Sequence, residues 1–418
     1  MSTTQAVLDR PTALNPASAP ATIADTAVQT KLMEAAARLR PIIAQRARQT
    51  ELDRRVSTDI TEQLTAAGLY RVVQPKRFGG HELGLEVLRR LAFELGRGCT
   101  STGWCYGLSA AASWVLGMFP GEAQQDVWGA SPDALIASCI APTGKAEPVA
   151  GGFRLQGRWS FGSNCDNAQW MSLGAMVQQE EGQPPRPVFL LVPKGEYEIV
   201  DTWHTVGLAG TGSKDIAITE PVFVPEHRTV AFADVLEQAG PGAELHASLI
   251  YRLPFLSGFP PLLANPAVSA LRGALDEFVD GVAARATRGA FAGGGQSIAQ
   301  FGHVQSAVAR GEAAVDAAQL ILQRDLQLAT DLVAAGTKLS AAQRITLRRG
   351  HAYAVQLCVE AINELYDVVG GTGIQLDNGV QRAWRDINAV AHHISVNWHA
   401  VSSMYGQMRL GLQPRGQY

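Results

Sequence analysis

The sequence predicts a mainly helical protein with a small β domain in its middle: an N-terminal helical domain, a central antiparallel β-barrel and a C-terminal four-helix bundle. Apolar residues recur at three- and four-residue intervals in the first third of the chain. Short strand-like runs separated by turn residues follow, and the remainder is again helical in pattern. The 418 residues, 46% hydrophobic and 17% charged, suffice for two or three domains sharing a large buried core.

The first third of the chain contains an arm and a helical domain. Residues 1–30, rich in Ala, Thr and Pro, are interpreted as a flexible arm, and residues 31–133 as the N-terminal helical domain. Asp59 and Glu62 have the spacing of a capping box, which predicts that a helix begins there. Residues 103–119 are unusually apolar, which predicts a helix buried on all sides.

Residues 134–235 form the predicted β domain. Gly151-Gly152 separates two strand-like runs and predicts a hairpin. Short strands with turn residues between them are typical of a small antiparallel barrel or sandwich. Further strands are expected near residues 170–177, 188–192 and 216–224.

Residues 236–418 form the predicted C-terminal helical domain. Ser340 and Gln343 form a capping box in front of a helix that is expected to end at Gly370-Gly371. A last helix is predicted from residue 380 through about Met408. Four segments of this length are typical of an antiparallel bundle.

Composition and motifs exclude several classes of protein. The 35 Lys and Arg against 38 Asp and Glu leave a net charge of −3, which disfavours nucleic-acid binding. No apolar run reaches the roughly 20 residues that span a bilayer, and no secretory or transit signal is present, so we expect a cytoplasmic protein without membrane contact. Five cysteines without a close pair indicate neither disulfides nor a metal site. The glycine-rich segments lie outside any βαβ unit, and hydrolase motifs are missing.

Three segments combine residue types that carry chemistry. Residues 159–166 place two aromatic rings beside short polar side chains, which fits either a surface for a flat heteroaromatic ring with hydroxyl donors for its nitrogens, or a strand end followed by a polar turn. Residues 203–213 form a glycine-rich loop, which is a weak signal alone. On the last predicted helix Asp386 and His393 share one face, so His393 is either a proton-exchanging imidazole or a core histidine bonded to a carbonyl.

The order of these segments, together with four others, resembles the acyl-CoA dehydrogenase superfamily from about Leu32 to Gln413. More narrowly, it resembles the oxygenase components of two-component flavin-dependent aromatic monooxygenases, of the hydroxyphenylacetate and steroid-phenol hydroxylase type. The segments that carry the resemblance are residues 74–80 (Gln-Pro-Lys-Arg-Phe-Gly-Gly), 99–104 (Cys-Thr-Ser-Thr-Gly-Trp), 138–144 (Ser-Cys-Ile-Ala-Pro-Thr-Gly), 157–166, 210–214 with 224–228, and 385–398.

The resemblance implies a defined chemistry and assembly. A separate NAD(P)H:flavin reductase supplies reduced FMN or FAD by diffusion. The oxygenase adds O2 to form a flavin C4a-hydroperoxide and transfers one oxygen atom to a phenolic, indolic or related aromatic substrate. A dry cavity protects such an adduct from loss of hydrogen peroxide. The resemblance also implies a homotetramer.

The resemblance further assigns roles to individual residues. Ser163 corresponds to the hydroxyl that contacts flavin N5, and His393 to a histidine beside the flavin, so both are expected to be catalytic. Arg288 and Phe291 match a segment near the flavin phosphates that reaches a neighbouring subunit. The expected flavin contacts are Trp159, Phe161, Gly162, Ser163, Ser138, Arg288, Phe291, Gly370 and Gly371, and the expected substrate contacts are Trp104, Ser109, Ala112, Ser113 and His392.

Two departures from the superfamily narrow the expected activity. Acyl-CoA dehydrogenases take an α-proton with a carboxylate, whereas residues 391–395 read Ala-His-His-Ile-Ser here, so thioester dehydrogenation is disfavoured. Some phenol hydroxylases carry a histidine where this chain has Ala112, which leaves indoles and other electron-rich aromatics open beside phenols. The alternatives are a flavin oxidase or dehydrogenase of the same fold, and a helical scaffold without catalysis.

Overall fold

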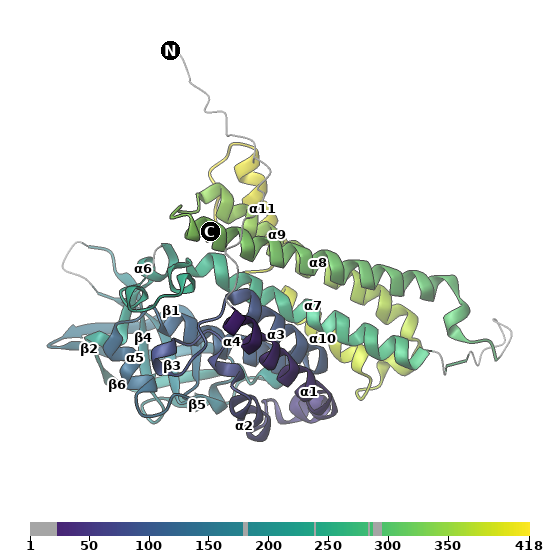
Figure 1. Cartoon of the computed structure of the whole chain (residues 1–418), viewed down its shortest axis with the longest axis horizontal. Coiled ribbons are helices and arrows are strands. Elements are labelled where there is room, and N and C mark those ends of the chain that lie inside the picture. Colours follow the sequence, from purple (N-terminus) through teal and green to yellow (C-terminus); the bar gives the residue numbers. More distant parts are fainter. Residues whose placement is uncertain (1–22, 179–182, 238–239, 283–284, 287–294) are drawn as a thin grey trace, which may run out of the picture.

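The computed structural model describes residues 23–178, 183–237, 240–282, 285–286 and 295–418. Helices at both ends of the chain enclose one side of a β-sheet, and the long C-terminal helices extend away from it (Figure 1). The N-terminal helices are α1 (Ile23–Asp53), α2 (Thr58–Ala66), α3 (Leu85–Gly98), α4 (Thr100–Leu116) and α5 (Gly121–Trp128).

Two N-terminal helices begin at residues that the sequence did not predict. Helix α1 begins at Ile23, inside the predicted arm, with Asp25 in its first turn, where a negative charge is favourable. Helix α2 has Ser57 at its N-cap position and no side-chain cap, so the predicted capping box of Asp59 and Glu62 is wrong. Asp59 lies inside the first turn instead of in front of it.

Helix α4 confirms the prediction of a helix buried all round. Every residue of it except Leu108 is buried. It crosses α3 at close range, since a Cβ on Gly103 would lie 2.5 Å from the Gly96 Cα atom. The absence of a side chain at this crossing lets the two backbones touch.

The β domain is one open seven-stranded sheet in the order β5-β6-β2-β1-β3-β4-β7. Its strands are β1 (Ile136–Val149), β2 (Gly152–Gly162), β3 (Trp170–Val177), β4 (Arg186–Pro193), β5 (Glu198–Val200), β6 (Lys214–Pro225) and β7 (Thr229–Ala231). The predicted hairpin is present, with Ala150-Gly151 as its loop and Val149 paired with Gly152. A short helix, α6 (Phe232–Glu237), follows the last strand.

The expected antiparallel barrel is wrong in two respects. Within the described residues the edge strands β5 and β7 do not pair, and β1 and β3 are parallel. After β2 the chain returns to the beginning of β1, where the Gln169 amide bonds the Leu135 carbonyl oxygen. Strand β3 therefore starts beside the start of β1 and runs in the same direction.

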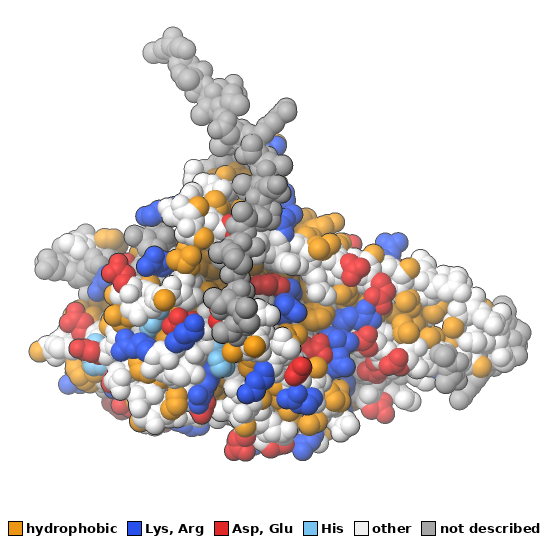
Figure 2. All heavy atoms as spheres, viewed as in Figure 1, with side chains coloured by type: hydrophobic (Ala, Val, Ile, Leu, Met, Phe, Trp, Pro, Cys, Tyr) orange, Lys and Arg blue, Asp and Glu red, His pale blue; other side chains and the backbone are white. Residues whose placement is uncertain are grey.

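The C-terminal helices are α7 (Phe255–Val282), α8 (Gly302–Ala334), α9 (Ala341–Val369), α10 (Gly379–Ala391) and α11 (Trp398–Arg409). Helices α7, α8 and α9 contact one another, and α10 packs on α7 and α9. The capping box of Ser340 and Gln343 is confirmed, with both reciprocal hydrogen bonds present. Acidic and basic side chains are interspersed with apolar ones on the visible face (Figure 2). None of the helices in the described ranges is long and apolar enough to cross a membrane.

The predicted last helix is in fact two helices. Helix α10 ends at Ala391, and the side chain of Asn397 accepts a hydrogen bond from the Ala400 amide to begin α11. The amides of Val396 and Asn397 both bond the His393 carbonyl oxygen, which closes the turn between the helices. His393 therefore lies in a turn and not on a helix.

Candidate active site

A buried group of hydroxyls surrounds Ser163 at the end of β2. The Ser163 Oγ atom is 2.7 Å from Ser213 Oγ, which is 2.7 Å from Thr211 Oγ1. Thr211 donates in turn to the Leu208 carbonyl oxygen at 2.8 Å. The indole N–H of Trp104, from α4, donates to Ser163 Oγ at 3.1 Å. Ser163, which is 6% exposed, thus joins the β domain to the most deeply buried N-terminal helix.

Phe161 presents an exposed aromatic ring two residues before Ser163. Its side chain is 69% exposed and its φ is +69°, a conformation that costs non-glycine residues roughly 1–3 kcal/mol and is concentrated at functional sites. The ring meets Trp203 edge to face, with centroids 6.0 Å apart. The site therefore offers a flat apolar surface beside a buried hydroxyl group.

His393 also lies close to Trp104, the residue that donates to Ser163. Their ring centroids are 6.0 Å apart. The His393 Nδ1 atom accepts a hydrogen bond from the Ser395 amide at 3.2 Å, so in the neutral imidazole the proton is on Nε2. Burial, and next the charge of Arg348, lower the pKa of His393 to about 4. His393 is therefore an uncharged hydrogen-bond donor at neutral pH.

Arg348 supports this turn from α9. It is 4% exposed and donates to the Ser395 carbonyl oxygen at 3.2 Å. Burial lowers its pKa to about 10, which leaves it charged at neutral pH. No carboxylate of the described residues pairs with it, and its Nε and Nη1 atoms have no hydrogen-bond partner there. A buried unpaired cation is unfavourable. The positive charge of Arg348 also disfavours a second positive charge on the His393 ring, which is why it lowers the pKa of His393.

Replacing Arg348 with Met is expected to raise the His393 pKa above 4 while leaving it below 6.5, because burial, the larger cause, remains. A depressed histidine pKa stabilises the fold above pH 6.5, and this contribution is lost as the pH falls toward 4. NMR titration of ¹³C-labelled histidines measures the shift, with His393→Gln as the assignment variant. Arg349→Met, which removes a guanidinium lying over Tyr405, is the matched control. An unchanged His393 titration in Arg348→Met contradicts the assignment.

Helix α10 also holds the loop that carries the hydroxyl cluster. The buried Asp386 Oδ1 atom accepts from the Leu208 amide at 2.7 Å, and burial raises the pKa of Asp386 to about 6. A Cβ at Gly207 would lie 2.3 Å from the Arg385 carbonyl oxygen, so only glycine allows this contact. The weak motif at residues 203–213 is therefore a docking segment that positions Thr211 and Ser213.

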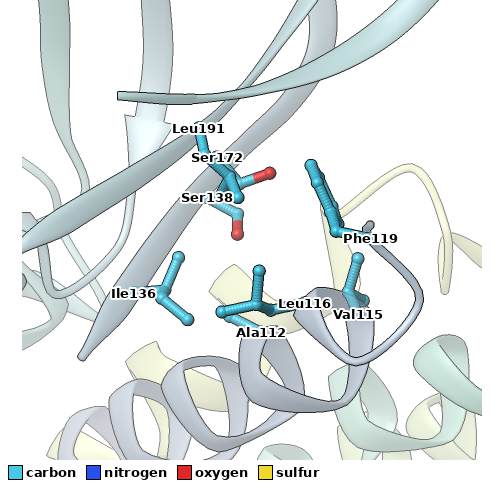
Figure 3. Close-up of a pocket in the computed structure, with 8 residues that line it drawn as sticks. All are labelled: Ala112, Val115, Leu116, Phe119, Ile136, Ser138, Ser172 and Leu191. Carbon is cyan, nitrogen blue, oxygen red and sulfur yellow. The ribbon is translucent and has the colours of Figure 1, made fainter. Parts of the chain in front are cut away.

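A small cavity lies between α4 and the sheet. It has a volume of about 10 Å³, enough for about one water molecule. Ser138 and Ser172 are register partners on the parallel strands β1 and β3, and their hydroxyls point into the cavity, with Ala112 opposite them (Figure 3). Both hydroxyls therefore border the open space of the cavity. The remaining lining is apolar: Val115, Leu116, Phe119, Ile136 and Leu191.

The structure places several predicted residues elsewhere. Trp159 is 1% exposed, and its indole donates to the Gly174 carbonyl oxygen inside the sheet's core, whereas the ring of Phe161 is exposed. Ser109 accepts from Asn164, so it orients the segment that follows Ser163. Ser113 is buried on α4. His392 is exposed, and its Nδ1 atom bonds the Asn388 carbonyl oxygen, so it lies outside the cluster.

Of the four residues expected near the flavin phosphates, the structure describes Gly370 and Gly371. Arg288 and Phe291 lie outside the described residues. Gly370 and Gly371 are exposed after the end of α9, at the end of the long helices that points away from the sheet (Figure 1). Arg285 donates to the Val369 carbonyl and the Thr372 hydroxyl there, so the segment after α7 and this glycine turn are neighbours.

Both halves of the chain match models of one protein family. Residues 27–130 match the model described as Acyl-CoA dehydrogenase, N-terminal domain, and residues 262–398 match Acyl-CoA dehydrogenase, C-terminal domain. The fold is therefore that of the acyl-CoA dehydrogenases.

Similar proteins define the family more narrowly. The oxygenase component of an FADH(2)-dependent resorcinol hydroxylase from Rhizobium sp. (strain MTP-10005) is 44% identical, covering 94% of this chain and 98% of that protein. The oxygenase subunit HsaA of a flavin-dependent monooxygenase from Rhodococcus jostii (strain RHA1) is 33% identical, and the match covers 90% of this chain and 97% of that protein. The crystal structure of 3-HSA hydroxylase from Rhodococcus sp. RHA1 superposes with a TM-score of 0.85 at 29% identity, covering 93% and 98%. The chain belongs to the oxygenase components of flavin-dependent hydroxylases.

Proposed function

We propose that this protein is the oxygenase component of a two-component monooxygenase that hydroxylates a phenolic or related aromatic compound. The observation that carries the proposal is that Trp104 contacts both Ser163 and the uncharged His393, while the exposed Phe161 lies two residues before Ser163. The reaction consumes the substrate, O2 and reduced flavin, and yields the hydroxylated product, water and oxidised flavin. The similar hydroxylases support this reaction class.

The residues present fit a reduced flavin. The exposed Phe161 ring offers an apolar face for the isoalloxazine, and a Cβ at Gly162 would lie only 3.1 Å from the Lys214 carbonyl oxygen and 3.3 Å from Cys139 Sγ, so a side chain there would be tight. Reduced FMN or FAD, when bound, supplies the electrons that activate O2. Ser163 would hold the ring at N5, and His393 would present its Nε2 proton to the reacting oxygen.

The cavity beside Ala112 supports a substrate with a small polar substituent. Its two serine hydroxyls border the open space, so a hydroxyl substituent of the aromatic substrate would take the place of one water molecule there and hydrogen-bond to them. The name of the 44% identical relative makes resorcinol the first compound to test.

Replacing Ala112 with Leu is expected to fill this cavity and lower kcat/KM for the aromatic substrate by roughly 10- to 100-fold, since the substrate hydroxyl would lose hydrogen bonds to the cavity serines of about 1–3 kcal/mol. Affinity for reduced flavin is expected to stay within about twofold, because neither Phe161 nor Ser163 is among the residues that line this cavity. Substrate titrations and anaerobic flavin titrations measure the two effects separately. Equal losses in both would contradict the separate substrate cavity.

The proposal extends to partners and assembly. A separate NAD(P)H:flavin reductase would supply the reduced flavin, as the phrase "oxygenase component" in the relative's name indicates. A homotetramer in the cytoplasm fits a diffusible cofactor and the exposed apolar side chains of Ile374 and Leu376 beside the glycine turn. Gly370 and Gly371 of this turn would serve the flavin of a neighbouring subunit, and the resemblance of the sequence assigns the same role to Arg288 and Phe291. Light scattering after gel filtration tests the assembly.

The experiment that tests the function is a coupled assay with an unrelated NADH:flavin reductase and ¹⁸O2. We expect one ¹⁸O atom in the ring-hydroxylated product when resorcinol, phenols or indoles are screened with FMN and FAD. Formation of hydrogen peroxide alone, with every aromatic compound, would overturn the proposed function. An acyl-CoA dehydrogenase activity is not proposed, since the turn at residues 392–397 holds no carboxylate.

A further inference from the structure

The hydroxyl chain around Ser163 has only one arrangement of protons. A carbonyl oxygen can only accept, so Thr211 donates its single hydroxyl proton to the Leu208 oxygen at 2.8 Å. The 2.7 Å contact between Thr211 and Ser213 then requires Ser213 to donate. The 2.7 Å contact between Ser213 and Ser163 in turn requires Ser163 to donate. The Leu208 carbonyl, at the end of this chain of hydroxyls, therefore requires Ser163 to donate its proton to Ser213.

Trp104 occupies a second hydrogen-bonding position of Ser163 Oγ. An indole N–H is a donor only, and it occupies one lone pair of Ser163 Oγ at 3.1 Å. One lone pair remains, and no proton. Contrary to the expectation of hydroxyl donors for ring nitrogens, Ser163 can therefore only accept a hydrogen bond from a ligand.

The hydroxyl chain is held rigidly in its direction. Ser163, Thr211 and Ser213 are all buried. Leu208, whose carbonyl sets the direction, is anchored through its amide by Asp386 on α10. Its carbonyl oxygen also accepts from the Trp203 indole and the Thr211 amide, and a carbonyl oxygen can only accept. If the hydroxyls donated in the opposite direction, Thr211 Oγ1 and the Leu208 carbonyl oxygen would face each other at 2.8 Å with no proton between them. Two unmatched acceptors in a buried site are unfavourable.

We propose that Thr211 and Ser213 are positioning residues that make Ser163 a pure hydrogen-bond acceptor and thereby select reduced flavin over oxidised flavin. The inference rests on the proposed function, in which Ser163 faces flavin N5. Reduced flavin carries a hydrogen on N5 and can donate it to Ser163. Oxidised flavin has only a lone pair there, so two acceptors would meet. The site thus takes the cofactor in its reduced form and releases it once the reaction has oxidised it, which suits exchange with a separate reductase.

Binding measurements on the free protein test this inference without turnover. Dissociation constants for reduced FMN and FAD, measured anaerobically, are compared with those for the oxidised forms. An unmatched acceptor costs about 1–3 kcal/mol, so we expect the wild type to favour reduced flavin by on the order of 10- to 100-fold. Ser213→Ala frees the Ser163 proton for oxidised N5, and the preference is expected to fall about tenfold, mainly through tighter binding of oxidised flavin.

Thr211 supplies the matched pair of variants. Thr211→Val removes the group that sets the direction and is expected to weaken the preference as Ser213→Ala does, whereas Thr211→Ser keeps the hydroxyl and the preference. A structural role alone would weaken both flavin forms equally. If the wild type binds reduced flavin but Ser213→Ala and Thr211→Val keep the preference within about twofold, the inference is overturned while the proposed function stands. Failure of the wild type to bind reduced flavin overturns both.

Discussion

Replacing Ser163 with Ala is expected to turn most of the O2 consumed into hydrogen peroxide. The hydroxyl is the one acceptor that the buried cluster offers to flavin N5–H, because Trp104 and Ser213 occupy its other positions. An N5 proton that is no longer held is free to leave with the oxygen. Losing a buried hydrogen bond of about 1–3 kcal/mol predicts a fall of roughly 5- to 100-fold in the ratio of hydroxylated product to peroxide.

The measurement is product and peroxide formed per reduced flavin, at saturating substrate. Ser160→Ala is the matched control, because Ser160 lies on the same strand with an exposed side chain. Thermal unfolding checks that both variants fold. A Ser163→Ala protein that couples flavin oxidation to hydroxylation as well as the wild type would show that N5 is not held by this side chain.

Replacing His393 with Asn is expected to lower the rate of hydroxylation on the order of 100-fold. The Asn side chain can still accept from the Ser395 amide, as His393 Nδ1 does, but it carries no donor at the position of Nε2. A buried donor aimed at developing charge contributes about 10²–10³-fold in enzymes of other kinds. His393→Gln, whose amide N–H reaches the Nε2 position, is expected to retain most of the rate.

Single-turnover rates with pre-reduced flavin separate this effect from flavin delivery. His392→Asn is the control at the neighbouring exposed histidine and is expected to leave the rate unchanged. Because the pKa of His393 is lowered to about 4, the wild-type rate should show no inflection from this residue between pH 5.5 and 8. Asn and Gln variants of equal activity would show that the Nε2 proton has no part in the reaction.

Local sequence patterns predicted some elements of the fold correctly. The Ser340 and Gln343 capping box and the all-round burial of α4 depend on neighbours along the chain, and both are confirmed. The division between α10 and α11 was missed because no proline or glycine marks it, and the Asn397 cap lies within a continuous helical pattern. The parallel pairing of β1 and β3 depends on strand order, which residue periodicity does not encode.

The sequence predicted Ser163, Phe161 and His393 as site residues, but it did not predict the contacts that hold them in place. Alternation along β2 placed Trp159 and Phe161 on one face, but the positive φ of Phe161 turns its ring outward while Trp159 stays in the core. Ser213 and Arg348 reach Ser163 and the His393 turn from distant parts of the chain. Only the glycine-rich character of residues 203–213 hinted at one of them, and nothing in the sequence distinguished Arg348 from other helical arginines.

The central claim is that this chain alone performs oxygen transfer with reduced flavin, and one measurement tests it most directly. Pre-reduced FMN or FAD is mixed anaerobically with the protein and resorcinol, without any reductase, and then with oxygenated buffer. The account predicts close to one hydroxylated product per reduced flavin, with little peroxide and with release of oxidised flavin. Flavin oxidation at the rate seen in protein-free buffer, with peroxide as the only product for resorcinol and the other aromatic compounds, would contradict it.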